Sequence, residues 1–326
     1  MKGAIRTVLG DRFAIEGVAY MHEHLILDSP LIADRFPHIH LHDVVAAVAE
    51  VARCRVAGAT LVLEAMPMSA GRDVVRLAEV ARRAEVDIVA ATGLHHDRYY
   101  GPRHWTNFVS IDELADLFVA DLVDGIDAFD YTGPIVRRTS HRAGVVKVAT
   151  SGSSLDDRDR RNLQAVGQAS VRTGAPVLTH CEEGKGGLEQ VARLTELGVP
   201  ASAIVLSHVD KSDDPGYLVA LAESGAVLEF DQSLREWEAG VNSRTVRSTL
   251  LLLEHGFASS IVLGTDGARR TLWHELGGAP GLAWLASHLP SVLRAAGVGD
   301  DDLDLLLRGN AERVLRWRTV HASGSG

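Results

Sequence analysis

Several features that mark particular protein classes are scarce in these 326 residues. Only two cysteines are present, Cys54 and Cys181, too few for a disulfide framework in so long a chain. The longest apolar runs fall far short of the roughly 20 residues needed to span a bilayer. The opening residues lack the apolar core of a signal peptide. We therefore expect a reduced, cytoplasmic protein that does not cross a membrane.

The chain also has fewer basic than acidic residues. Lysine and arginine number 33 against 43 aspartates and glutamates, so the formal net charge is −10. No stripe of basic side chains is dense enough to neutralise a nucleic acid backbone, so we expect no nucleic acid partner. With 46% hydrophobic residues, the chain has ample material for a large buried core.

The arrangement of the apolar residues predicts the fold class. Short β-rich runs alternate with longer segments of helical periodicity, a pattern typical of repeated βα units and a parallel sheet. Eight runs are expected as strands: 18–25, 59–64, 87–92, 144–149, 175–180, 203–208, 225–230 and 260–266. The helix candidates include 42–58, 71–84, 157–173, 188–198 and 246–256. Eight such units predict one α/β domain, a (β/α)8 TIM barrel over residues 1–326.

The first 16 residues carry a different pattern. Segments 5–8 and 13–15 flank residues 9–12, which predicts a short N-terminal β-hairpin closing the barrel floor. An open, doubly wound sheet is the alternative fold. That fold usually needs a glycine-rich turn after its first strand, where this chain has Met21-His22-Glu23-His24-Leu25. We therefore favour the barrel.

Polar residues gather at the expected strand ends, where such barrels carry their catalytic groups. His22 and His24 are two residues apart on the first strand, so both imidazoles face the barrel axis. This spacing suits one metal ion, although solvated histidines at a strand end give the same pattern. Four more polar residues end later strands on the same rim: Lys147, His180, His208 and Asp266.

The presence of Lys147 among candidate metal ligands needs an explanation, because an ammonium group is unfavourable beside a cation. A Schiff-base or general-base lysine is one alternative, but it has no need of four histidines around it. The whole combination resembles the phosphotriesterase family of the amidohydrolase superfamily, over nearly the whole chain. The resemblance is carried by residues on strands one, four, five, six and eight: His22, His24, Lys147, His180, His208 and Asp266.

The resemblance implies a binuclear metal-dependent hydrolase. Lys147 would be carboxylated by CO2, and its carbamate would bridge two divalent ions that share a hydroxide. The implied ligands are His22, His24 and Asp266 for the more buried ion, and His180 and His208 for the more exposed one. Imidazole and oxygen ligands favour zinc, with manganese, cobalt or iron as alternatives. The bridging hydroxide would attack an ester, with Asp266 as the general base by family likeness.

Neighbouring residues receive lesser roles. Asp210 and Asp231, just past strands six and seven, are candidates for relaying a proton outward, or else are helix caps or loop anions. Glu23 points away from the axis by strand alternation and is expected to support the ligands. Cys181 points outward as well and is expected to pack against other residues.

Family members differ in their loops and open sugar lactones or acyl-homoserine lactones, or hydrolyse organophosphate triesters. The loop residues are therefore expected to determine which substrate binds. The loops after strands three and eight look most like the sugar-lactonase branch. Tyr99 or Tyr100, with Arg235 and Arg269, are candidate contacts for a phosphate or for sugar hydroxyls. Alternatively, Arg269 and Arg270 pair with helix carboxylates on the outer ring, and Tyr99 and Tyr100 pack a loop. Segment 231–260 offers no long apolar lid, so a polar lactone is favoured over a fatty acyl one.

A barrel that binds a sugar-like ligand without turnover is the alternative from another class. A member of the family without catalytic activity should lack at least one of the six predicted ligands, yet all six are present. We therefore expect an enzyme that acts on a small-molecule substrate. Because members of the family are often homodimers, the resemblance also implies a homodimer.

Overall fold

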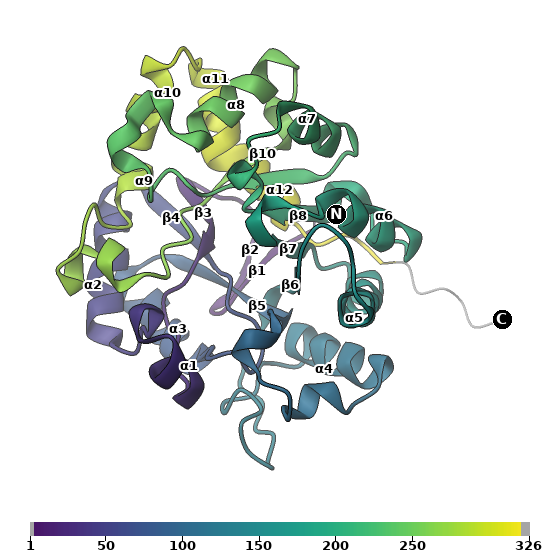
Figure 1. The fold of residues 1–326 in the computed structure, drawn as a ribbon. Coiled ribbons are helices and arrows are strands. Elements are labelled where there is room, and N and C mark those ends of the chain that lie inside the picture. Colours follow the sequence, from purple (N-terminus) through teal and green to yellow (C-terminus); the bar gives the residue numbers. More distant parts are fainter. Residues whose placement is uncertain (1–2, 321–326) are drawn as a thin grey trace.

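The computed structural model of the chain describes residues 3–320. Eight parallel strands lie in the middle with helices around them, and each strand pairs with the next one along the chain (Figure 1). The strands are β3 (Val18–Glu23), β4 (Ala59–Glu64), β5 (Asp87–Leu94), β6 (Ala143–Thr150), β7 (Val177–Cys181), β8 (Ile204–Ser207), β9 (Val227–Phe230) and β10 (Ile261–Leu263). This topology confirms the predicted (β/α)8 barrel.

The helices form the outer layer. They are α1 (Pro30–Arg35), α2 (Val44–Val56), α3 (Val74–Ala84), α4 (Ile111–Val123), α5 (Asp157–Thr173), α6 (Gly187–Glu196), α7 (Pro215–Glu223), α8 (Arg244–Glu254), α9 (Trp284–Ser287), α10 (Leu289–Ala295), α11 (Asp300–Asp304) and α12 (Asn310–Leu315). Within residues 3–320, no helix combines the length and the apolar character that crossing a membrane requires.

Capping residues set the helix bounds. Helix α5 has the predicted bounds, since Asp156 accepts a hydrogen bond from Asp159 N and Gly174 ends the helix at φ 81°. Helix α3 begins at Val74 rather than at residue 71, because Asp73 is its N-cap. Helix α8 begins two residues before the predicted start, because Ser243 caps it.

The ring closes between its first and last strands at the carboxyl end. Thr265 N and Asp266 N both donate to His22 O, at 3.3 and 2.9 Å. Gly264 permits this approach, because a Cβ at this position would lie 2.5 Å from Glu229 Oε1 and 2.8 Å from His22 N. The closing contact therefore joins the segments that carry three of the predicted metal ligands, His22, His24 and Asp266.

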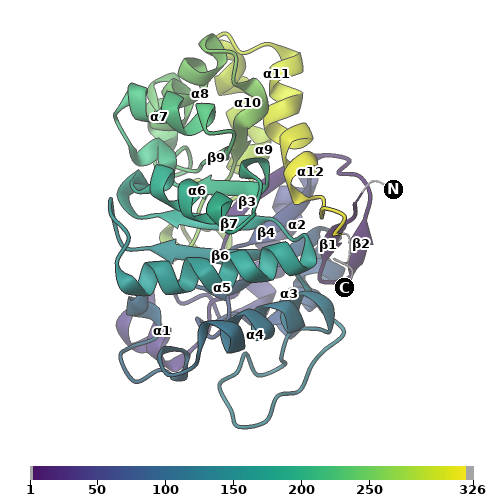
Figure 2. The same cartoon turned by 90° about the vertical axis from the view of Figure 1, so that its right-hand side faces the viewer.

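The opposite end of the barrel is closed by both ends of the described chain. A hairpin is present as predicted, but its strands are β1 (Ile5–Thr7) and β2 (Gly10–Arg12), so the prediction of a second strand at 13–15 was wrong. The chain turns at Val8 and Leu9, because Thr7 pairs with Gly10, which has a φ of 130°. Figure 2 shows the hairpin beside α12. Residues 1–2 of the predicted hairpin lie outside the described residues.

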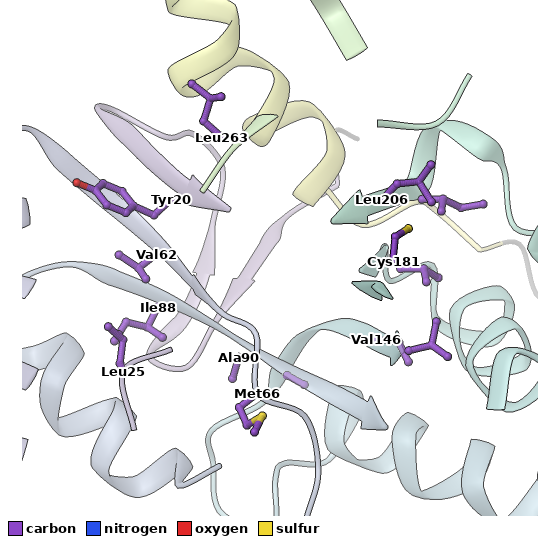
Figure 3. Packing of buried hydrophobic residues seen from close by; sticks show 14 of the residues in the cluster. Tyr20, Leu25, Val62, Met66, Ile88, Ala90, Val146, Cys181, Leu206 and Leu263 are labelled. Carbon is purple, nitrogen blue, oxygen red and sulfur yellow. The ribbon is translucent and has the colours of Figure 1, made fainter. Parts of the chain in front are cut away.

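Two apolar layers hold the barrel together. The inner one is made of strand residues such as Val145 and Leu178, with Ile5 and Val314 sealing the floor. The outer one lies between strands and helices and includes Val146, Cys181 and Leu206 (Figure 3). The strict alternation of inner and outer residues along β6 and β7 is what directs particular polar side chains toward the barrel axis.

Candidate metal centre and substrate cavity

A cavity of about 330 Å³ opens at the carboxyl end of the strands. Its walls include residues from strand ends and from the loops that follow them. Among them are five of the six predicted metal ligands: His22, His24, His180, His208 and Asp266. The sixth, Lys147, lies fully buried with its Nζ 3.4 Å from His22 Nε2. The structure thus brings all six predicted residues into one cluster.

The imidazole rings pack against one another. The ring centroids of His22 and His208 are 4.6 Å apart, and those of His180 and His208 are 4.5 Å apart. His24 approaches the same group, with its Nε2 3.4 Å from Asp266 Oδ1. His22, His24 and Asp266 each offer a ligand atom to a common point, which fits one divalent cation.

Two of these residues have backbone conformations that side-chain-bearing residues rarely adopt. His208 has a φ of 66° and Asp266 a φ of 42°. The left-handed conformation turns His208 toward the cavity at the end of β8, where strand alternation alone would turn it outward. Such conformations persist where the surrounding structure holds them in place, and they cluster at functional sites.

Each of the four histidines has a carboxylate beside one ring nitrogen. His180 Nε2 is hydrogen-bonded to Glu182 Oε2 at 2.7 Å, and His208 Nδ1 to Asp231 Oδ2. The Nδ1 atoms of His22 and His24 each lie 3.4 Å from a glutamate oxygen, of Glu229 and Glu64 respectively. Carboxylates in these positions orient imidazole ligands and make them more basic.

Burial keeps two of the four histidines, His22 and His180, from holding protons. It lowers the pKa of His22 well below its ordinary value and that of His180 to about 3. A neutral imidazole offers a lone pair to a cation, and cation binding offsets the cost of burying acceptors without donors. The donor set therefore fits divalent metal ions of the zinc type.

Lys147 has no ion-pair partner among the described residues, although its side chain is fully buried. Burial lowers the pKa of its amine to about 8. The neighbouring strand leaves no spare room, because a Cβ on Gly93 of β5 would clash with the backbone of Lys147. The two strands are therefore closely packed here, and the buried amine is more readily deprotonated than that of an exposed lysine.

Asp266 is paired with a predicted substrate residue. Arg235 Nη2 donates to Asp266 Oδ2 at 2.7 Å and to the Asp266 carbonyl at 2.8 Å. Burial alone would raise the pKa of Asp266, but the Arg235 guanidinium and the His24 hydrogen bond bring it well below its ordinary value. Asp266 is thus an ionised carboxylate with one oxygen committed to Arg235.

The remaining substrate candidates separate into two groups. Tyr99 and Arg269 line the cavity, and within residues 3–320 the Arg269 guanidinium has no hydrogen bond or ion pair. Tyr100 is not part of the lining, since its hydroxyl accepts from His95 N at 2.8 Å and donates to Met68 O at 3.0 Å. The structure thus gives Tyr100 the loop-packing position that was the alternative for it.

The supporting residues also have defined positions. Glu23 accepts hydrogen bonds from Thr265 and Gly267, so it holds the segment that carries Asp266. Asp210 accepts from Asp231 N and two other groups, and neither aspartate caps a helix. Asp231 instead contacts His208 directly. Cys181 is buried in the outer layer, as expected.

Sequence reasoning missed several cavity residues, namely His95, Arg98, Glu182 and Lys211. Arg98 Nη2 donates to both oxygens of Glu182, which in turn contacts His180. Their position in the sequence could have identified them, since each lies within four residues of the end of a strand. His95 follows β5 directly, and Glu182 follows β7 directly.

Comparison with known proteins gives consistent matches over nearly the whole chain. The phosphotriesterase family matches residues 4–315. A phospho-furanose lactonase of Mycoplasmopsis agalactiae is 29% identical over 330 residues, covering 96% of this chain and 91% of its own length. An aryldialkylphosphatase of Saccharolobus solfataricus is 29% identical over 254 residues, 77% of this chain and 76% of its own length.

The fold comparison agrees with the sequence matches. The crystal structure of an amidohydrolase from Mycoplasma synoviae superposes with a TM-score of 0.91 at 26% identity. The match covers 98% of this chain and 94% of that one. The barrel and its loops therefore have counterparts along almost their full length.

Proposed function

Because the chain belongs to the phosphotriesterase family and is a hydrolase acting on ester bonds, we propose that it opens a polar lactone, either a sugar lactone or a phosphorylated one. The choice of a polar lactone rests on the residues that line the cavity. Beside the histidine cluster it presents Arg235 and Arg269, and apolar side chains are the minority of its lining. Guanidinium groups favour a substrate rich in oxygen atoms.

We propose that two divalent ions, zinc first among the candidates, bind in this cluster. His22, His24 and Asp266 would hold the more buried one, and His180 and His208 the more exposed one. When bound, such ions lower the pKa of a water molecule and polarise the carbonyl oxygen of an ester. The carboxylates beside the four imidazoles would fix the ring orientations and leave the opposite nitrogens free for the ions.

We also propose that Lys147 is carboxylated. Its neutral amine would attack the carbon of CO2, forming an N–C bond and losing one proton, so that a cation is replaced by an anionic carbamate. This change would remove the conflict between an ammonium group and the metal ions. Support comes from the buried Nζ at 3.4 Å from His22 Nε2 and from its lack of an ion-pair partner among the described residues.

The proton transfer falls to Asp266 in this proposal. Its carboxylate is ionised and would accept the proton of the attacking water. The water oxygen bonds to the carbonyl carbon, the bond between that carbon and the ring oxygen breaks, and the ring oxygen takes the proton from Asp266 to become a hydroxyl group. Arg235, which holds one oxygen of Asp266, keeps the carboxylate oriented for this role. The product is an open-chain hydroxy acid.

A pH-indicator assay on metal-loaded protein tests the proposal. The substrates are ribono-1,4-lactone, its 5-phosphate, an acyl-homoserine lactone and a chromogenic phosphotriester. We expect turnover of the two ribonolactones to exceed that of the others. Preferred hydrolysis of the phosphotriester or of the acyl-homoserine lactone would contradict the substrate assignment, and no hydrolysis at all would favour a barrel that only binds its ligand.

Replacing Arg269 with glutamine should separate the phosphorylated from the plain substrate. A hydrogen bond to a charged group contributes about 1.5–3 kcal/mol, so kcat/KM for the 5-phosphate should fall about 10- to 100-fold. The plain lactone should lose far less. Arg270→Gln is the matched control, because Arg270 donates to His40 O and does not line the cavity. Equal losses on both substrates would refute a phosphate contact at Arg269.

The cytoplasmic location and the homodimer stay predictions. Both cysteines are free and buried.

A further inference from the structure

His95 is a buried histidine of the cavity wall that has no part in the centre described above. It follows β5 directly and is 4% exposed, and its ring lies between Tyr99 and His180, with centroid distances of 4.4 and 5.2 Å. Its position by strand alternation is inward, since Val89 and Ala91 of the same strand belong to the inner layer.

The backbone fixes which ring nitrogen of His95 carries the proton. Nδ1 accepts a hydrogen bond from His96 N at 2.6 Å, so Nδ1 must be unprotonated. A neutral imidazole then carries its single proton on Nε2. Nε2–H is therefore the free donor of this ring.

The position of the residue is fixed from both sides. His95 N donates to the Tyr100 hydroxyl at 2.8 Å, and Arg158 Nη2 donates to His95 O at 2.9 Å. Nε2 itself has no hydrogen-bond partner among the described residues, and it is not one of the atoms sealed from solvent. The structure thus holds a rigid, unsatisfied donor at the cavity wall.

We propose that His95 is a specificity-determining residue whose Nε2–H donates to an oxygen substituent on the lactone ring. This inference rests on the proposed function, because it needs a lactone in the cavity. A substrate with a hydroxyl group there satisfies the donor, whereas an unsubstituted ring leaves it buried and unpaired. His95 would therefore select oxygenated lactones over apolar ones.

The test compares kcat/KM for ribono-1,4-lactone and for γ-butyrolactone, which has the same ring without hydroxyl groups. His95→Phe keeps a flat ring but removes the donor, so the preference for ribonolactone should fall about tenfold, with less than about a twofold change on γ-butyrolactone. His95→Gln places an amide N–H near the position of Nε2 and should restore part of the preference. His96→Phe is the matched control, because His96 is the next residue and does not line the cavity.

Nitrogen NMR of the zinc-loaded protein with labelled histidine gives a readout independent of turnover. The His95 signal, assigned by its loss in His95→Gln, should show the Nε2–H tautomer. A proton on Nδ1, or equal losses on both lactones in His95→Phe, would overturn the proposal for His95 alone. Wild-type protein that hydrolyses neither lactone would overturn the proposed function and this inference together.

Discussion

Replacement of Asp266 by asparagine is expected to lower lactone turnover by about 100- to 10,000-fold, the range spanned by general-base catalysis. Asparagine has nearly the same shape, and its amide oxygen can still accept from Arg235. It has no charge to attract a cation, however, and it cannot accept the proton of the attacking water. The measurement is kcat with saturating metal, together with thermal unfolding followed by circular dichroism.

The control for this variant is Asp213→Asn. Asp213 has a side chain that is 72% exposed and pairs with arginines at 3.8 Å on the outer surface, so turnover should be unchanged. A folded Asp266→Asn protein that retains more than a tenth of wild-type turnover would remove Asp266 from the general-base role. Loss of the folded state would show that the carboxylate also stabilises the barrel.

Replacement of Lys147 by alanine should remove both bound metal and activity. Loss of residues that merely support metal ligands typically costs 10- to 100-fold, so loss of a bridging ligand should cost about 100-fold or more. Alanine also leaves space where the buried side chain was. A short carboxylate such as propionate fits this space and should restore part of the metal content and part of the turnover.

Metal content by mass spectrometry and kcat/KM, each with and without propionate, measure this effect. Lys185→Ala is the control, because Lys185 is exposed and lies outside the cavity lining. Full metal retention in Lys147→Ala, with no response to propionate, would mean that no carbamate bridges the ions.

Strand alternation allowed part of the site to be predicted from sequence. On β6, Val145 belongs to the inner layer and Val146 to the outer one, so Lys147 must face inward. The same rule places His180 inward on β7, two residues after Leu178. For such regular strands, the period of two is enough to place a side chain once the strand is recognised.

Irregular backbone limits this reasoning elsewhere. Strand β3 changes register between Tyr20 and Glu23, so Met21 in the inner layer and His22 beside it both face inward. His208 reaches the cavity only through its left-handed conformation. The sequence shows neither feature. Spacing and strand-end position placed these residues on the rim, but the irregular backbone decides that their side chains face inward.

The partners of the site residues come from other strands or loops. Glu229 lies beside His22 although the two are far apart in sequence, and Arg235 reaches Asp266 from the loop after β9. Their pairing depends on how the ring closes, which no local pattern encodes. Tyr100 shows the same limit, since only the fold reveals that its hydroxyl binds backbone groups instead of facing the cavity.

The most direct test of the binuclear centre is a crystal structure of zinc-loaded protein, with anomalous diffraction recorded at the zinc edge. We predict two anomalous peaks, one among His22, His24 and Asp266 and the other beside His180 and His208, separated by about 3.5–4 Å. Density for a carboxyl group should extend from Lys147 Nζ to both peaks. A single peak, or peaks away from these residues, with an unmodified Lys147, would contradict the account.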